Sequence, residues 1–149
     1  MKKYLLFIPV FLFLFSCNET FRDFQKVEDM KWHRNDVKKF KVNIPEDGSY
    51  DLFFAMRHST GYPFTSIKIL INQLTPDGNE LTKEAEFQVA NDAGEYIGEV
   101  TGQLWDIKAL FSENTTLKKG EYVFEIMHNM NTDPVILVID IGLIIKKSK

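Results

Sequence analysis

Apolar and polar residues alternate along much of the chain after residue 36, and this period of two predicts β-strands. Phe40, Val42 and Ile44 share one face of the first strand, and the turn sequence "PEDGS" at 45–49 closes it. The segment 50–57 alternates in the same way. Isoleucines at 67, 69 and 71 mark a third strand, which ends at "TPDGNE" (75–80), where proline and glycine suit a tight turn. Further strands are expected at 85–90 and from Gly120 onward.

Two later segments complete the predicted fold. The stretch "GEYIGEVTGQLWDIKALF" (94–111) indicates strands with bends, although "LWDIKALF" is also compatible with one helical turn. The run "VILVIDIGLIIKK" (135–147) holds seven valines and isoleucines, which disfavour a helix and fit a central strand covered on both faces. Many short strands separated by turns predict an all-β fold, an antiparallel β-sandwich of jelly-roll or immunoglobulin-like kind, spanning 37–149.

The N-terminus has a different pattern. Lys2 and Lys3 precede an apolar run of 12 residues, 4–15, which is shorter than the roughly 20 residues of a membrane-spanning helix and typical of a secretory signal peptide. The run ends in "LFSC" (14–17), which resembles a bacterial lipobox, with Phe15 bulkier than usual. Residues 1–16 are therefore predicted to be a lipoprotein signal peptide and Cys17 the acylated first residue of the mature chain. The alternative is a free cysteine in an ordinary, discarded signal peptide.

The segment 17–36 is polar, with scattered aromatic residues and no clear period. It is predicted to be a lipid-anchored tether and entry segment, of which residues 27–32 begin to pack against the domain. Acyl chains on Cys17 would hold such a tether on a membrane.

Charge and motif content narrow the function. The formal charge of −3 becomes −5 when Lys2 and Lys3 leave with the signal peptide, and this acidity argues against nucleic-acid binding. His33, His58 and His128 lack metal-ligand spacing, so they are interpreted as surface or loop histidines. The alternative is that His58 and His128, which each end a strand, meet at one rim of the sandwich. No nucleophile motif or phosphate-binding loop is present, so neither an enzyme nor a cofactor is expected.

Aromatic residues outside the strands leave two interpretations open. Tyr62, Phe64 and Tyr96 lie in or near turns. The favoured interpretation is that they cap the ends of the core. The alternative is that exposed rings stack on sugars, which would make the protein a lipid-anchored carbohydrate-binding module.

Several segments in order along the chain resemble the gliding-motility lipoprotein family GldH of the Bacteroidota. They are the lipobox cysteine Cys17, Trp32 before the strand with Phe40, "YDLFFAMRHSTGYPFTSIKILI" (50–71), "LWDIKALF" (104–111), "LKKGEYVFEIMHNM" (117–130) and "IDIGLIIKK" (139–147). The resemblance implies a non-catalytic envelope lipoprotein, an accessory or assembly component of gliding motility and the associated type IX secretion machinery. It implies partners among those machinery proteins and no site residue beyond Cys17.

Three residues are candidates for a partner-facing surface: Arg57 at a strand end, Tyr62 in a turn and Trp105. Arginine and aromatic residues are enriched at interfaces, but local packing explains them equally well. The residues after Cys17, Asn-Glu-Thr at 18–20, lack the aspartate that favours inner-membrane retention in some bacteria. The expected location is therefore the outer membrane, facing the periplasm.

Overall fold

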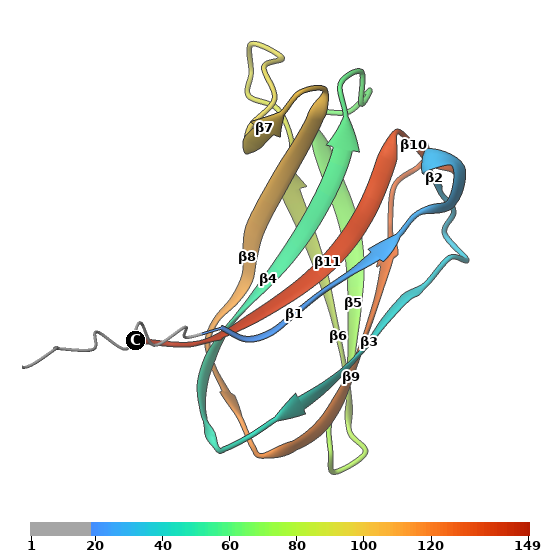
Figure 1. Cartoon of the computed structure of the whole chain (residues 1–149). Coiled ribbons are helices and arrows are strands. Elements are labelled where there is room, and N and C mark those ends of the chain that lie inside the picture. The colour runs from blue at the N-terminus through green and yellow to red at the C-terminus, as the bar shows by residue number, and fades with distance from the viewer. Residues whose placement is uncertain (1–18) are drawn as a thin grey trace, which may run out of the picture.

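The computed structural model describes residues 19–149, which form two antiparallel β-sheets packed face to face (Figure 1). The first sheet has the order β1 (Glu19–Lys26), β11 (Val138–Lys147), β4 (Gly48–Ser59), β8 (Leu104–Leu117), β7 (Glu99–Thr101). The second has the order β3 (Lys38–Ile44), β9 (Gly120–His128), β5 (Ser66–Leu74), β6 (Glu80–Gln88). A short pair joins β2 (Lys31–Trp32) to β10 (Val135–Ile136), and a 3₁₀ turn spans Glu28–Met30. The predicted all-β antiparallel sandwich is confirmed.

The core follows from the alternation of apolar residues in the strands. Phe40, Val42 and Ile44 of β3 are at most 1% exposed, while the residues between them face solvent. The inward residues of both sheets form one apolar cluster, to which β9 contributes Phe124 and Ile126. Both sheets and this cluster are built from residues 19–149.

The strand β11 lies inside the first sheet, between β1 and β4. The apolar run that contains it is interrupted at Leu137, which adopts φ 64° and separates β10 from β11. Ile141 and Ile145 face the core, and Ile144 on the opposite face is only 2% exposed. The expected burial on both faces is confirmed for the middle of β11, and on the outer face the Phe24 ring of β1 lies against Gly142.

The prediction of a tether is wrong for residues 19–26, whereas the expected packing within residues 27–32 is confirmed by the buried Val27 and Trp32. From Glu19 the chain is already β1, which pairs along its length with β11 as the edge of the first sheet. Trp32 is fully buried, and its Nε1 donates a hydrogen bond to the Asp36 carbonyl at 2.9 Å. The alternation of apolar and polar residues in β1 is difficult to recognise in the sequence for two reasons. A register shift separates Glu19 from Phe21, and an edge strand with one face in solvent tolerates polar residues.

Two other expectations have different outcomes. The strand expected over 104–111 is confirmed as part of β8, a strand of 14 residues, and the alternative of a helical turn is wrong. The strand expected at 85–90 is β6, which begins earlier, at Glu80, and ends at Gln88. Within residues 19–149, no helix has the length and apolarity needed to cross a membrane.

Candidate functional site

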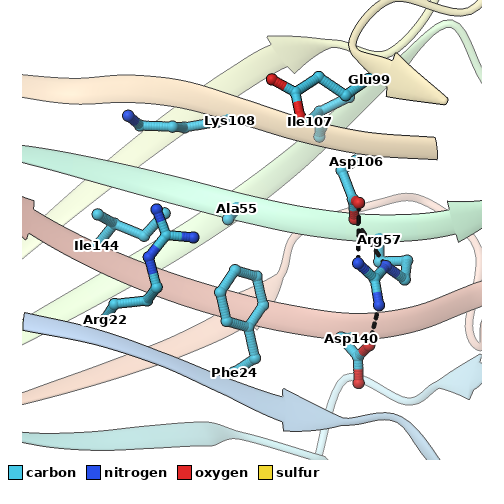
Figure 2. Close-up of a pocket in the computed structure, with 10 residues that line it drawn as sticks. All are labelled: Arg22, Phe24, Ala55, Arg57, Glu99, Asp106, Ile107, Lys108, Asp140 and Ile144. Carbon is cyan, nitrogen blue, oxygen red and sulfur yellow. Dashed lines mark hydrogen bonds and ion pairs between the residues drawn. The ribbon is translucent and has the colours of Figure 1, made fainter. Parts of the chain in front are cut away.

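A cleft of about 530 Å³ lies on the outer face of the first sheet (Figure 2). Phe24, Gly142, Ala55 and Lys108 occupy adjacent positions on β1, β11, β4 and β8 in one row across the strands. Gly142 and Ala55 have small side chains, so the surface of the sheet is hollow at the middle of this row. The Phe24 ring lies beside Gly142, where an added Cβ would come within 2.6 Å of it. The cleft therefore exists because two small residues sit between two large ones.

An ion-pair network closes one end of the cleft. Arg57 donates from Nε to Asp106 Oδ1 at 2.7 Å and from its Nη2 to Asp106 Oδ2 at 2.9 Å, and Asp140 lies 3.8 Å from Nη1. The hydrogen bonds to Asp106 raise the pKa of the Arg57 guanidinium. The Arg57 side chain is 41% exposed, and a surface ion pair of this kind stabilises a fold by about 1 kcal/mol at most. Its clearest effect is to hold a fixed, accessible guanidinium at the cleft.

A second charged group lies at the other end of the cleft, near the start of β1. Glu19 accepts hydrogen bonds from Arg22 at 2.6 Å (Nε) and 3.0 Å (Nη2), and the Lys146 ammonium lies 3.7 Å from Glu19 Oε2. The hydrogen bond from Arg22 is the largest cause that lowers the pKa of Glu19. Lys108 reaches toward the same end, with its Nζ 4.1 Å from the centre of the Phe53 ring.

The end of the sandwich near the β4–β5 loop carries a cluster of aromatic rings. His58 is in ring contact with Tyr62 at 5.0 Å and Tyr96 at 4.9 Å between centroids, and Tyr96 is 5.4 Å from Trp105. The Tyr96 hydroxyl donates to the Tyr62 carbonyl at 2.9 Å and accepts from the Gly61 amide at 3.0 Å. Tyr62 is 3% exposed, and burial raises the pKa of its hydroxyl. The rings of this cluster fasten the loops to the end of the core.

The second buried histidine has other neighbours. The His128 ring makes an edge contact with Trp32 at 5.4 Å, and its Nε2 lies 3.4 Å from the Asp133 carboxylate without hydrogen-bond geometry. His58 and His128 are both completely buried, so their interpretation as surface or loop histidines is wrong; His33 is exposed. Each lies on the inward face of its strand, where an imidazole fills core volume. In residues 19–149, no group of three or more metal-ligating side chains could hold an ion.

The three predicted partner-facing residues do not share one surface. Arg57 points outward into the cleft, whereas His58, the next residue on β4, points inward with Tyr62, Tyr96 and Trp105. The favoured interpretation of the turn aromatics as caps on the core is confirmed for Tyr62, and the idea that its ring is exposed is wrong. Trp105 is partly exposed and donates from Nε1 to Thr60 Oγ1 at 3.3 Å. Cys17 lies outside the described residues.

Most of the residues around the cleft could not be identified from the sequence. Asp140 could be identified from the sequence, because a single carboxylate within a run of valines and isoleucines is expected to have a cationic partner. Arg22 and Phe24 could not, because the mostly polar sequence of β1 shows no regular alternation. Asp106 and Lys108 lie on alternate positions of β8, and only the pairing of β8 with β4 places them beside Arg57 and Ala55.

Comparison with known proteins assigns the family. The family model described as GldH lipoprotein matches residues 19–145, from the first described strand to the end of β11. The chain belongs to the GldH lipoprotein family. As a member of the GldH family it is a lipid-anchored cell-envelope protein of the gliding-motility lipoprotein type.

Two curated relatives agree with this assignment. The chain is 26% identical over 128 residues to "Gliding motility lipoprotein GldH homolog" of Christiangramia forsetii, covering 83% of this chain and 79% of the relative. It is 27% identical over 114 residues to "Gliding motility lipoprotein GldH" of Flavobacterium johnsoniae, covering 74% and 70%.

Solved structures resemble the GldH-family sandwich only loosely. One is an isomalto-dextranase of Arthrobacter globiformis with panose, at a TM-score of 0.42 and 16% identity, covering 72% of this chain and 16% of that one. Another is a family 35 carbohydrate-binding module of Clostridium thermocellum, at a TM-score of 0.36 and 12% identity, covering 80% and 97%. Likenesses at this level give no information about function.

Proposed function

We propose that this protein is a non-catalytic assembly component of the gliding machinery and of the associated type IX secretion apparatus, held in the membrane by acyl chains on Cys17. The observation that carries the proposal is the family match over residues 19–145, which takes in both sheets of the sandwich. What this chain has in common with the family is thus the whole described domain and not a single segment of it.

The position of the anchor suits a fixed component. β1 begins at Glu19, two residues after Cys17. An acylated Cys17 therefore holds the sandwich directly on the membrane, and confinement to a surface raises the effective concentration of partners in the same membrane. We place the protein in the outer membrane, facing the periplasm, on the absence of aspartate after Cys17.

The function is tested by deleting the gene in its host and measuring colony spreading and the amount of protein secreted to the medium. We expect both to fall and to be restored by the wild-type gene. A Cys17→Ser gene should fail to restore them, because serine has no thiol to form the thioether with lipid. Normal spreading of the deletion strain would overturn the role in gliding, and normal secretion would overturn the link to the secretion apparatus.

The cleft offers a narrower test of partner binding. Arg57→Gln removes the fixed guanidinium, and Lys39→Gln is the matched control, because Lys39 is a half-exposed lysine paired with Glu125 at 2.8 Å on the other sheet. We expect only Arg57→Gln to reduce spreading and to reduce recovery of envelope proteins in a crosslinked pulldown. Equal effects of the two substitutions, at equal protein levels, would exclude Arg57 from the partner surface.

Location is tested by separating inner and outer membranes on a sucrose gradient and by treating intact cells with protease. Recovery in the outer membrane with protection from protease is expected. Recovery in the inner membrane, or cleavage in intact cells, would overturn the proposed placement.

The carbohydrate alternative has lost the feature that motivated it. Tyr62 is buried, and Tyr96 is turned toward His58 and the Tyr62 carbonyl, so these rings do not form a flat exposed platform. Sugar binding on such sandwiches needs rings that can stack on the ligand.

A further inference from the structure

The start of β1 fixes how the domain meets its membrane. Two residues of extended chain span at most about 7 Å, so the Cα of Glu19 lies within that distance of Cys17. Glu19 pairs with Lys146 near the end of β11, so the C-terminal end of the chain lies at the same place (Figure 1). Given acylation of Cys17, this corner of the first sheet lies at the level of the lipid headgroups.

Three cations converge at this corner around one carboxylate. Arg22 and Lys146 both contact Glu19, at 2.6 and 3.7 Å, and Lys108 approaches from β8 across the Phe53 ring. Arg22 and Lys108 line opposite walls of the cleft in Figure 2. We call Arg22, Lys108 and Lys146, with Glu19, the corner cluster.

The corner cluster has more positive than negative charge. Burial, then the neighbouring Lys146 ammonium and Arg22, lower the pKa of Lys108, and only Glu19 acts in the opposite direction. The next carboxylate on this face, Asp51, accepts hydrogen bonds from the Asn114 amide at 2.9 Å and the Ser148 hydroxyl at 2.7 Å. The carboxylates of Asp106 and Asp140 lie with Arg57 at the far end of the cleft.

The excess of positive charge in the corner cluster does not follow from the overall composition of the chain. The mature chain carries a formal charge of −5, the −3 of the full sequence less Lys2 and Lys3. Such a chain is repelled by an anionic membrane unless its cations are collected where it meets the surface. Three of them, Arg22, Lys108 and Lys146, lie close to the predicted anchor residue.

We propose that the corner cluster binds the phosphate of an anionic phospholipid in the leaflet that holds the anchor, with Arg22, Lys108 and Lys146 as its ligands. Arginine suits the bidentate recognition of phosphate, and lysine supplies point charges beside it. The bound lipid fixes the rotation of the sandwich about its anchor and so determines which face a partner meets. The inference rests on the proposed anchoring at Cys17 for its biological setting, but not for its chemistry.

Vesicle binding tests the chemistry without the anchor. Residues 17–149 with Cys17→Ser contain both sheets and the whole core, and they are mixed with vesicles of phosphatidylcholine alone or with one fifth phosphatidylglycerol. We expect flotation only with the anionic vesicles, and loss of it in 0.5 M salt. Each lysine contributes about fivefold at such a surface, so Lys108→Gln with Lys146→Gln should weaken binding by about thirtyfold.

A matched control separates the corner cluster from net charge. Lys39→Gln with Lys68→Gln removes two lysines from the second sheet, where they pair with Glu125 and Glu86 at 2.8 and 3.9 Å. This control should bind like the unsubstituted chain, and Lys108→Arg with Lys146→Arg should keep binding. Circular dichroism and the unfolding temperature establish that each variant is folded. Equal weakening in the two glutamine pairs, or no anionic preference in the first place, overturns the proposal.

Inorganic phosphate distinguishes a lipid site from a site for a free anion. Phosphate that raises the unfolding temperature through Lys108 and Lys146, together with vesicle binding that phosphate competes away, supports the lipid assignment. Phosphate stabilisation without vesicle binding overturns it. The intact mass of protein extracted from membranes tests acylation separately, so a failure of the anchor and a failure of the corner cluster give different results.

Discussion

Acidification is expected to destabilise the sandwich through its two buried histidines. His58 and His128 are 0% exposed, and the Nε2 atom of each lacks a hydrogen-bond partner in the described part of the chain. A protonated imidazole at either position would place a charge in the core with little to solvate it. Burial is the largest cause of the lowered pKa of both rings.

The direction of the effect follows from that lowered pKa. The unfolded chain binds a proton on each histidine as the pH falls below about 6.5, whereas the folded chain does so only at lower pH. The stability that depends on the neutral histidines is therefore fully present above pH 6.5. It decreases as the pH falls and is lost once the pH is below the pKa of the folded state. The free energy of unfolding should decrease by up to about 1.4 kcal/mol per pH unit for each histidine, or about 2.7 for both.

Neighbouring charges shift the pKa values of the two histidines differently. The Asp133 carboxylate, 3.4 Å from His128 Nε2, favours the proton on His128, while Arg34 opposes it. For His58, the hydrogen bond to the Ser59 carbonyl and the charge of Asp106 favour the proton. Asp133→Asn should therefore make the acid destabilisation steeper. Glu19 and Glu125 have pKa values lowered from 4.5, so they contribute mainly below that pH and leave the interval from 4.5 to 6.5 to the histidines.

The assay is urea unfolding at 25 °C, followed by tryptophan fluorescence, on residues 17–149 with Cys17→Ser between pH 4.5 and 8. His58→Asn and His128→Asn each remove one titrating group, and each should roughly halve the slope whatever it does to stability at pH 8. An unchanged slope in the double variant would refute the argument. So would stability that increases as the pH falls through this interval.

Three further substitutions test the packing. Trp32→Ala should lower the free energy of unfolding by about 3–5 kcal/mol, because it empties a fully buried site and removes the hydrogen bond to Asp36. Val37→Ala, at a 37% exposed position, should lower it far less, and similar losses in chemical unfolding would contradict the burial of Trp32. Gly142→Ala should lower the free energy of unfolding by about 1 kcal/mol, because the added Cβ meets the Phe24 ring. In the Phe24→Ala background the same substitution should have no such effect, and additive losses in this double-mutant cycle would show that the ring does not cover Gly142. Tyr96→Phe should cost about 1 kcal/mol, because it removes the hydrogen bonds of the hydroxyl with the exposed Gly61 amide and the part-buried Tyr62 carbonyl. Hydrogen exchange at Gly61 should become faster, and unchanged exchange would contradict this role of the hydroxyl.

The strands of the core could be predicted from the sequence because their signal is local. Phe40, Val42 and Ile44 lie on one face of an extended chain whatever that chain pairs with, so β3 appears in the alternation itself. The same holds for β5, and the β-branched run of β11 indicates an interior strand. The acylation of Cys17 also depends on a local motif, and it stays a prediction.

The edges and the cleft depended on contacts between distant segments. β1 is a polar edge strand with a register shift, and nothing within residues 19–26 says that Phe24 will cover Gly142, a residue more than a hundred positions away. The alternation along β4 separates Arg57 from His58, but only the packing of the sheets decides that Tyr62 turns inward beside His58.

The sequence alone thus determined the class of fold, the apolar face of most strands and a lipid-modification motif, because these follow from the chain's own period and order. The tertiary structure decided that the residues from Glu19 to Lys26 belong to the sandwich as its edge strand β1. It also brought Arg22, Lys108 and Lys146 to one corner. Side chains from three strands gather there only when β1, β11 and β8 take their places in the sheet, and that register is set by pairing between residues far apart in the chain.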